Sequence, residues 1–380
     1  MRVAVAGLGL RAGHVLSILK AHMTEIRFAG YVDPSPAGRA ALDPDMPEFD
    51  DLAGMLRDTA PDLLFVGSPN HLHLDHIRAG LRAGVRVFAE KPVVISEDET
   101  FALAELLAEH GSDRVIVGLV LRYSQHMRDL RAALDAGHLG TVVSMEGSEH
   151  IAPYHGAFFM RDWRRKSAYS GGFMLEKCCH DLDVYNMITG SRPARVASFG
   201  GRRSFVPDNA PETANPEYTR KKSLWEAAED AFTASGDIVD NQTAILEYET
   251  GASLAFHTNT NVPDEYRRFA VIGTKGMAEG DFVRGFLKIT DAGSRTTISD
   301  HDYSGDTALK GAHYGADEMM CADIAQFLHG DRPTLPVSVV DAMEAGLVAM
   351  AIDRARQSGQ VVDLTDIWAR LDQFGLRDAR

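Results

Sequence analysis

The chain has 380 residues, of which 45% are hydrophobic and 24% are charged, so its composition is that of a folded globular protein. With 39 Lys and Arg residues against 54 Asp and Glu residues, the net charge is −15, which disfavours nucleic acid and anionic membrane surfaces as partners. No apolar run approaches the roughly 20 residues that span a bilayer, and three cysteines rule out a disulfide framework. We therefore expect a cytoplasmic protein of two domains, whose net charge still allows a small negatively charged ligand.

The N-terminal sequence carries a glycine pattern between a predicted strand and a predicted helix. Residues 2–6 (RVAVA) are typical of a strand buried on both faces, and 7–12 (GLGLRA) follow at once, ahead of apolar residues at helical spacing. In such a G-x-G-x-x-A pattern Gly7 permits a tight turn, Gly9 lets a pyrophosphate approach the backbone, and Ala12 allows close helix–strand packing. The pattern predicts a dinucleotide site, although a tight turn in any α/β protein would also explain it.

A second predicted strand, 27–33 (RFAGYVD), ends on an acid. Asp33 lies 21 residues after Ala12, about where dinucleotide-binding domains place a ribose-binding carboxylate. A carboxylate there accepts hydrogen bonds from ribose hydroxyls and repels a 2′-phosphate. The position favours NAD over NADP, with Arg39 keeping NADP as an alternative and a plain turn before Pro34 as the other explanation of Asp33.

The alternation of strands and helices continues through the first third. Further strands are predicted at 62–67, 85–90 and 114–120, with a helix near 72–83. Helices between parallel strands predict a doubly wound sheet, whose ligands lie beyond the carboxyl ends of the strands. The segments 7–12, 68–70 (SPN) and 90–92 (EKP) would then border one crevice.

Lys91 is the first candidate for the chemistry. It comes just after an apolar strand, and Pro92 restricts it to an extended conformation. A lysine near the positive ring of an oxidised nicotinamide should have a lowered pKa, and could bind a substrate hydroxyl and help to move its proton. The alternative is a lysine that simply faces solvent.

The second candidate motif is 171–183 (GGFMLEKCCHDLD), which is helical in pattern after its glycines. Glu176, His180 and Asp183 form a narrow stripe on one side of this helix. A carboxylate four residues before a histidine can orient the imidazole as a general base, although the stripe would also suit a solvated helix face. The run 178–180 (CCH) lacks metal-ligand spacing, because adjacent helical residues point about 100° apart, so we expect no metal.

Taken together, these motifs resemble the Gfo/Idh/MocA family, the oxidoreductases named for glucose–fructose oxidoreductase and inositol dehydrogenase. The resemblance rests on GLGLRA, SPN, AEKP, LRY and SGG followed by E-x-x-x-H-x-x-D, with weaker echoes at 248–256, 271–281 and 313–317. It implies an N-terminal Rossmann domain and a C-terminal α/β domain with a large, mostly antiparallel open sheet that often makes dimer or tetramer contacts. It also implies that Lys91 and His180 match the family's lysine and histidine, with Glu176 at a position that is usually Asp in inositol dehydrogenases.

The remainder of the chain shows a different hydrophobic pattern. Strand candidates at 141–147, 243–250 and 253–259 alternate apolar and polar residues, which predicts antiparallel pairing, and 338–356 reads as a helix. The least patterned stretch, 202–238, contains a short helical run near 223–233 and is either a lid-like insertion or a passive loop. We predict a Rossmann domain over 1–122 and a domain for substrate binding and oligomerisation over 123–380.

These observations favour an NAD(P)-dependent oxidoreductase that transfers hydride between nicotinamide and a secondary alcohol or ketone of a sugar, polyol or cyclitol. The alternatives are a glycoside-processing enzyme with tightly bound NAD in a transient redox cycle, and a non-catalytic cofactor-binding sensor. The predicted partners are a small-molecule substrate and further copies of the chain in a homodimer or homotetramer. The predicted catalytic residues are Lys91, His180 and Glu176. The predicted cofactor contacts are Gly7, Leu8, Gly9, Arg11, Ala12, Asp33, Ser68, Pro69, Asn70, His73, Glu90, Lys91 and Arg122, and the predicted substrate contacts are Tyr123, Tyr154, Trp163, Arg164, Asp183 and His313.

Overall fold

The computed structural model of the chain describes residues 1–225, 227–306 and 312–377. Its contacts divide the chain into two compact units. The first unit comprises Met1–Tyr123, Gly311–Gly346 and Trp368–Arg380, and the second comprises Ser124–Lys310 and Leu347–Ile367. The first unit thus includes C-terminal segments that a single cut at residue 122 would leave in the second.

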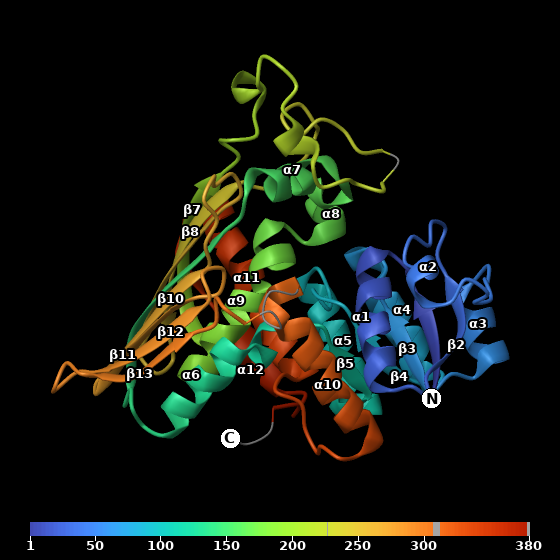
Figure 1. The fold of residues 1–380 in the computed structure, drawn as a ribbon, viewed down its shortest axis with the longest axis horizontal. Helices are drawn as coiled ribbons and strands as arrows, with labels where there is room; N and C mark the ends of the chain where they lie inside the picture. Colours follow the sequence, from blue (N-terminus) through green and yellow to red (C-terminus); the bar gives the residue numbers. More distant parts are fainter. Residues whose placement is uncertain (226, 307–311, 378–380) are drawn as a thin grey trace. The chain divides into compact units, whose positions relative to one another are not determined.

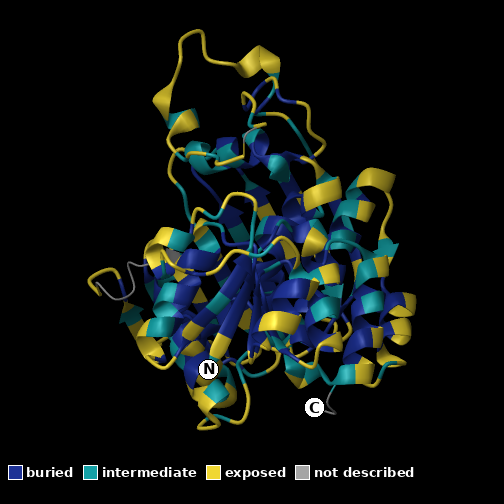
Figure 2. Cartoon of the chain, turned by 90° about the vertical axis from the view of Figure 1, so that its right-hand side faces the viewer, coloured by how far each residue is buried: buried dark blue, intermediate teal, exposed yellow. Residues whose placement is uncertain are grey.

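A parallel sheet forms the core of the first unit. Its strands are β1 (Arg2–Ala6), β2 (Arg27–Val32), β3 (Leu63–Val66), β4 (Arg86–Ala89) and β5 (Val115–Val117). The helices of this unit are α1 (Leu10–His22), α2 (Arg39–Leu42), α3 (Leu52–Thr59), α4 (His73–Arg82), α5 (Glu97–His110) and α10 (Ala316–His329). The apolar runs of β1 and β3 are almost fully buried, as the dark blue strands of Figure 2 show. The predicted doubly wound parallel sheet is therefore confirmed.

The strand order places the predicted ligand loops at one edge of this sheet. The order is β2-β1-β3-β4-β5, so the chain leaves β1 for β2 on one side and returns to β3 on the other. This reversal leaves a switch point between β1 and β3, where ligands of doubly wound sheets bind. The loops after β1, β3 and β4, which carry the glycine pattern, SPN and EKP, all follow carboxyl ends at that edge.

The predicted fifth strand is shorter than expected. It was predicted over 114–120, whereas β5 ends at Val117. The backbone N–H of Gly118 still donates to the carbonyl oxygen of Ala89 at 2.9 Å, after which the chain turns into a short 3₁₀ helix, Leu121–Tyr123. The apolar residues that suggested a longer strand are buried beyond the sheet instead of within it.

A nine-stranded sheet dominates the second unit (Figure 1). Its order is β13-β12-β11-β10-β6-β9-β8-β7-β14, and every neighbouring pair is antiparallel except β6 with β9. The strands are β6 (Val142–His150), β7 (Pro193–Gly201), β8 (Asn241–Tyr248), β9 (Ser253–Asn259), β10 (Arg268–Gly273), β11 (Gly276–Asp281), β12 (Phe286–Asp291), β13 (Thr297–Asp302) and β14 (Val362–Asp363). Helices α6 (Gln125–Asp135), α7 (Pro153–Arg161), α8 (Ser167–Ser170) and α9 (Phe173–Thr189) belong to this unit, while α11 (Val339–Ser358) and α12 (Thr365–Asp372) run from one unit into the other. The predicted large, mostly antiparallel sheet is confirmed.

The helix predicted near 223–233 does not form in the described part of that segment. Instead, Asp230 Oδ1 accepts N–H bonds from Phe232 and Thr233 at 2.9 and 3.1 Å, which closes a turn. The ring of Phe232 packs against Tyr218 and Phe205 at centroid distances of 4.9 and 5.4 Å. Phe205, Tyr218 and Phe232 therefore pack together within 202–238, whereas Leu224 and Trp225 are exposed. Figure 2 shows the outer turns of this segment as mostly exposed.

Candidate active site

The glycine pattern forms a tight loop between β1 and α1. Gly7 has φ +86°, and a Cβ placed on it would lie 2.2 Å from the backbone nitrogen of Ser68, so only glycine fits. Gly9 precedes the first turn of the 13-residue α1, and a Cβ placed on it would meet no atom within 4 Å. Ala12 approaches the end of β3 closely, since a Cβ on Gly67 would lie 3.0 Å from its own Cβ. Open space in front of a helix N-terminus is what a dinucleotide pyrophosphate requires, so these residues fit the cofactor.

This loop makes two glycine substitutions informative. We expect Gly7→Ala to lower the melting temperature and to abolish NADH binding, because the new methyl group collides with the backbone of β3's loop. Gly9→Ala is its matched control: the melting temperature should hold, while NADH affinity falls by roughly tenfold or more because the methyl group occupies the approach of the phosphates. Thermal denaturation and NADH fluorescence titration measure both, and a Gly9→Ala variant with unchanged affinity would contradict the phosphate assignment.

Asp33 joins the end of β2 to the glycine loop. Its Oδ2 accepts the backbone N–H of Leu8 at 2.5 Å, and its Oδ1 accepts that of Ser35 at 2.6 Å. Arg39, the residue that would favour NADP, donates to the hydroxyl of Tyr31 at 3.2 Å and lies 5.4 Å from the centre of its ring. The carboxylate is thus at the loop, whereas the guanidinium is tied to the neighbouring tyrosine.

His73 ties the loop after β3 to the loop after β4. Its Nδ1 lies 2.8 Å from the carbonyl oxygen of Pro92, and its Nε2 lies 2.9 Å from that of Ser68. The Ser68 hydroxyl in turn lies 3.0 Å from Nδ1 of His76, whose pKa is lowered to about 4 by burial and by His73. Asn70, like His73, is buried. His73 therefore joins the segments SPN and EKP, and the predicted crevice that they would border remains a prediction.

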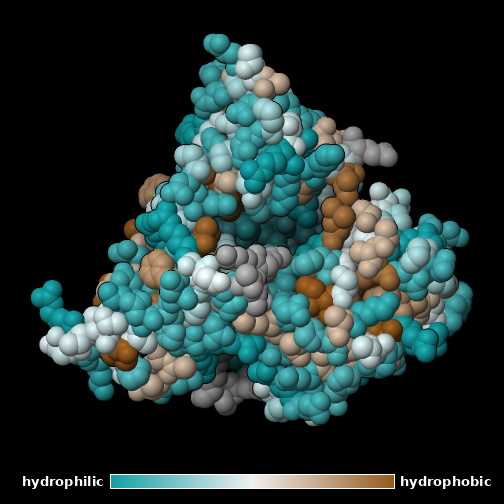
Figure 3. All heavy atoms as spheres, in the orientation of Figure 1, coloured by the Kyte–Doolittle hydropathy of each residue, from teal (hydrophilic) through white to brown (hydrophobic). Residues whose placement is uncertain are grey.

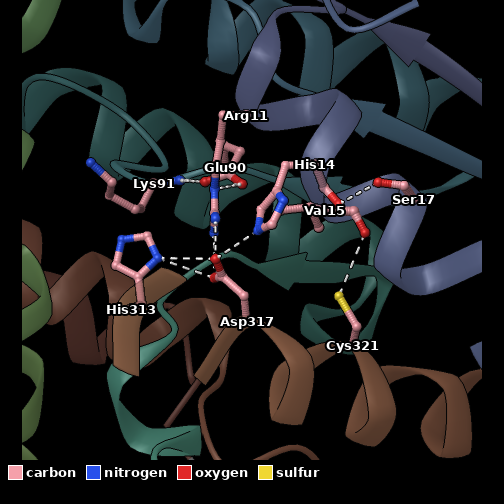
Figure 4. Close-up of polar contacts among 9 residues, drawn as sticks. All are labelled: Arg11, His14, Val15, Ser17, Glu90, Lys91, His313, Asp317 and Cys321. Carbon is pink, nitrogen blue, oxygen red and sulfur yellow. Dashed lines mark hydrogen bonds and ion pairs between the residues drawn. The ribbon is translucent and has the colours of Figure 1, made fainter. Parts of the chain in front are cut away.

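The EKP loop is also joined to α1. Arg11 Nε donates to Glu90 Oε1 at 3.0 Å, and the backbone N–H of Lys91 lies 3.4 Å from Glu90 Oε2 (Figure 4). Lys91 is half-buried, and its peptide bond to Pro92 is cis. The loops after β1 and β4 are thus linked by an ion pair next to the candidate lysine.

The LRY segment is buried more deeply than a ligand-facing segment would be. Arg122 Nη2 pairs with Asp341 Oδ1 at 3.1 Å and its Nη1 donates to the carbonyl oxygen of Pro336 at 3.2 Å, with 6% of the side chain exposed. Tyr123 is fully buried. Both were predicted to contact ligands, and those roles remain predictions beside these structural contacts.

Helix α9 in the second unit carries the other half of the candidate chemistry. Gly171 and Gly172 lead into it with φ values of +80° and +94°. Glu176, His180 and Asp183 are 4%, 2% and 1% exposed, so the polar stripe is not a solvated helix face. Since buried polar side chains require partners, the stripe serves a specific structural or chemical purpose.

Glu176 is held by an ion-pair chain. Arg164 Nε donates to Glu176 Oε1 at 2.9 Å, and Arg164 Nη1 donates to Asp162 Oδ1 at 2.8 Å. The hydroxyl of Ser223 donates to Asp162 Oδ2 at 2.6 Å, which connects the 202–238 segment to this chain. The guanidinium of Arg164 also lies 4.2 Å from the ring centre of Trp163. Arg164 was predicted to contact substrate, and the structure gives it a second task at the predicted orienting carboxylate.

Tyr154 lies beneath a cation from the same segment. The guanidinium of Arg220 is 4.1 Å from the centre of its ring, and burial raises the pKa of its hydroxyl. The phenol therefore stays protonated at neutral pH and can donate a hydrogen bond. Its predicted role at the substrate remains a prediction.

A buried ion network anchors α9, and the sequence did not reveal it. Lys177 Nζ lies 2.9 Å from Glu149 Oε1, whose second oxygen lies 3.0 Å from Arg267 Nε. Arg267 also donates to both oxygens of Asp181, at 2.8 and 2.6 Å. Asp317, a partner of Arg11, was likewise missed, although it ends the HYGAD echo at 313–317. The only sequence signal for these ion pairs was a charged residue within an otherwise apolar stretch. Such a residue suggests a buried ion pair but does not show which residue of opposite charge it contacts.

Two searches of the described residues returned nothing. Among them, no group of three His, Cys, Asp or Glu side chains could hold a metal ion. In the same residues, no helix has the length and apolar character needed to cross a membrane. The face drawn in Figure 3 is mostly hydrophilic, with apolar residues scattered over it.

Comparison with known proteins links this geometry to a family. Residues 1–119 match the family model GFO_IDH_MocA, described as an oxidoreductase family with an NAD-binding Rossmann fold. Residues 131–364 match GFO_IDH_MocA_C, described as the C-terminal alpha/beta domain of that family.

Individual relatives and structures are similar at low identity. YteT of Bacillus subtilis, a protein named as an oxidoreductase, is 24% identical over 92% of this chain and 94% of its own. The 2,7-anhydro-N-acetylneuraminate hydratase of Mediterraneibacter gnavus is 23% identical over 73% of this chain and 66% of its own. The scyllo-inositol dehydrogenase of Lactobacillus casei, solved with NAD(H) and scyllo-inositol, matches with a TM-score of 0.71 and 19% identity over 96% of this chain and 99% of its own. Because the two family models together match most of its length, this chain belongs to the Gfo/Idh/MocA oxidoreductase family, with an NAD-binding Rossmann domain and a C-terminal α/β domain.

Proposed function

We propose that this chain is an NAD-dependent dehydrogenase that oxidises a secondary alcohol of a sugar, polyol or cyclitol to the ketone. The observation that carries the proposal is the joining of three loops at the carboxyl edge of the parallel sheet. Arg11 links the glycine loop to EKP through Glu90, and His73 links EKP to SPN through Pro92 and Ser68. Lys91 therefore lies between the two residues of EKP that make these links. The L. casei dehydrogenase with NAD(H) and scyllo-inositol, which shares the fold, supports the choice of ligands.

The cofactor would be held by backbone groups of the first unit. Gly7, Leu8, Gly9 and Ala12 would meet the pyrophosphate at the start of α1, and Asp33 would accept hydrogen bonds from the ribose. Ser68, Pro69, Asn70 and Glu90 line the neighbouring loops. The carboxylate at the loop and the engagement of Arg39 with Tyr31 favour NAD over NADP. When bound, the nicotinamide supplies the hydride acceptor.

The proton of the substrate hydroxyl would pass to the predicted catalytic residues. His180 would take it as general base, with Glu176 four residues earlier on α9 orienting its imidazole. Lys91 would hydrogen-bond the same oxygen and share in the proton transfer. Tyr154, Trp163, Arg164 and Asp183 remain the proposed surroundings of the substrate.

A panel of sugars, polyols and cyclitols, each assayed with NAD and with NADP, tests the proposal. We expect the absorbance of reduced nicotinamide to rise with at least one compound, and to rise faster with NAD. A faster rate with NADP would overturn the cofactor assignment. A silent panel, together with tight NADH binding, would instead favour the sensor alternative.

A second candidate function is supported by the similarity to a hydratase. In that case hydride would leave and return within one catalytic cycle, so reduced cofactor would not accumulate. The same panel distinguishes the two: product detected by NMR without a change in nicotinamide absorbance supports the transient cycle. Net reduction of NAD in step with product supports the dehydrogenase.

We further propose that the protein is a cytoplasmic homo-oligomer that pairs through the outer face of the nine-stranded sheet. Phe199 on β7 is 73% exposed and Ile245 on β8 is 61% exposed, and these strands are adjacent. Such residues on a broad open sheet are typical of a subunit interface. Light scattering of the purified protein, with Ile245→Glu as the disruptive variant, measures the expected dimer or tetramer.

A further inference from the structure

Asp317, at the start of α10, is the centre of a charged cluster in the first unit (Figure 4). Its Oδ2 and Oδ1 accept hydrogen bonds from Nη1 and Nη2 of Arg11 at 2.5 and 2.8 Å. Nδ1 of His313 lies 3.2 Å from both carboxylate oxygens. Nε2 of His14, a half-exposed side chain, lies 3.4 Å from Oδ2. Arg11 is one of the predicted cofactor contacts and His313 one of the predicted substrate contacts, whereas Asp317 had no predicted role.

The cluster lies at the ligand edge of the parallel sheet. Arg11 is in the first turn of α1, two residues after Gly9, and its Nε is bound to Glu90 at the carboxyl end of β4. Asp317 therefore binds the same arginine that links the loop after β1 to the loop after β4. His313 is carried to the same place, and Figure 4 shows it on the same side of the Arg11–Asp317 pair as Lys91.

The backbone holds His313 in a rare conformation. His313 and Tyr314 have φ values of 51° and 61° with ψ values of 40° and 37°, the left-handed region that residues with a side chain seldom adopt. Two such residues in succession are found where the surrounding structure imposes them, and such positions cluster at ligand sites. With 27% of its side chain exposed, His313 is accessible to a small molecule.

The charges assign different tasks to the members of the cluster. Burial opposes ionisation of Asp317, but the hydrogen bonds from His313 and Arg11 outweigh it and hold its pKa well below the usual range. Burial also opposes the charge on Arg11, and Glu90 and Asp317 outweigh it and raise the guanidinium pKa. An ionised carboxylate at Nδ1 orients an imidazole and makes Nε2 the nitrogen that meets a ligand. Three of the guanidinium nitrogens of Arg11 are meanwhile engaged with two carboxylates.

We propose that His313, oriented by Asp317, hydrogen-bonds a substrate hydroxyl through Nε2, and that Arg11 is a positioning residue for Asp317 instead of a phosphate ligand of the cofactor. The substrate half of this inference rests on the proposed function, because it takes a polyhydroxylated substrate from it. The Arg11 half does not, since it concerns only the ion pairs and NADH binding.

NADH titration by fluorescence tests Arg11 without any substrate. The Kd for NADH should change by less than about threefold in Arg11→Gln, because the guanidinium holds a carboxylate and not a phosphate. Glu318→Gln is the matched control, since Glu318 neighbours Asp317 on α10 but has an exposed side chain paired with His22. A Kd raised by roughly tenfold or more in Arg11→Gln, with Glu318→Gln unchanged, would show that Arg11 supports cofactor binding and would overturn this half.

The ring pKa of His313 tests whether Asp317 acts on its imidazole. Its Cε1–H resonance, assigned from its loss in His313→Gln, gives the ring pKa by NMR titration. We expect Asp317→Asn to lower that pKa by about one unit or more, because the change removes a negative charge that lies 3.2 Å from Nδ1 of the ring. An unchanged pKa in a folded Asp317→Asn protein would show that the carboxylate does not act on the ring.

Kinetics with the best compound of the panel complete the test. His313→Gln and Asp317→Asn should each lower kcat/KM by roughly 10²-fold, and the losses from Arg11→Gln and Asp317→Asn should be less than additive in the double variant, since part of the effect of Arg11 passes through Asp317. Wild-type kcat/KM in His313→Gln would overturn the substrate contact. A silent panel would overturn that contact together with the proposed function, whereas the NADH and NMR results would still decide the role of Arg11.

Discussion

Replacing His180 with alanine should lower kcat by roughly 10²–10⁴, the range for the loss of a general acid–base group. The imidazole is 2% exposed on α9, and Glu176, one turn earlier, is fixed by Arg164 at 2.9 Å. In the proposed function His180 is the general base and Glu176 orients it; bulk water does not replace a buried base, so the substitution removes proton transfer from the hydride step. The rate of NAD reduction with the best panel compound, at saturating cofactor, measures the effect.

Two further measurements separate chemistry from folding. The Kd for NADH should change by less than about twofold, because the cofactor contacts belong to the first unit whereas His180 belongs to the second. The limb of the pH–rate profile that reports the base should vanish. His126→Gln is the matched control: His126 is also buried in the second unit, packed against Tyr303 and Phe282 at centroid distances of 4.3 and 4.9 Å. A His180→Ala enzyme with wild-type kcat would remove His180 from the mechanism.

The same helix shows what the sequence could predict about the site. The glycines, Glu176, His180 and Asp183 were recognisable because their spacing within one short segment encodes a turn and one helix face. The sequence could not show whether that face is exposed to solvent, because it does not distinguish a buried, ion-paired carboxylate from an exposed one. The structure decides it by burying the face and bringing Arg164 to Glu176.

Ion pairs between residues far apart in the chain could not be predicted from the sequence for a related reason. Asp181 and Arg267 are separated by 86 residues, and Arg11 and Asp317 by 306. Such pairs are created by the folding of each unit, and no local period or spacing records them. The sheets were predicted correctly because hydrophobic periodicity is a local property. The helix expected near 223–233 was wrong in the described residues of that stretch, because Phe232 packs against Phe205 and Tyr218 while Leu224 and Trp225 are exposed, so these residues form no common helix face.

Replacing Arg267 with methionine should lower the free energy of unfolding by about 3–5 kcal/mol, the range for breaking a buried ion pair by removing one partner. Arg267 is 2% exposed and contacts Asp181 and Glu149, which are 5% and 3% exposed. Methionine fills much of the space but leaves Asp181 as a buried charge without its cation, while Glu149 keeps Lys177 at 2.9 Å. Urea unfolding followed by circular dichroism measures the loss.

The pH dependence of that loss identifies its cause. Burial raises the pKa of Asp181 from 3.8 to about 6, against the opposing effect of Arg267. Between those two values the folded protein binds more protons at Asp181 than the unfolded chain does, so this residue's contribution favours folding more as the pH falls. Without Arg267 the pKa of Asp181 rises further, so the deficit of Arg267→Met should be largest above pH 6 and should shrink towards pH 5.

Two companion variants make this prediction specific to the buried charge. Adding Asp181→Asn to Arg267→Met should recover part of the lost stability, because the unpaired carboxylate is then neutral. Arg195→Met removes an exposed ion pair with Glu247 and should destabilise the protein far less, without the same pH dependence. An Arg267→Met deficit that is the same at pH 5 and pH 7.5, and that Asp181→Asn does not relieve, would mean that lost packing and not the uncompensated charge destabilises the anchor of α9.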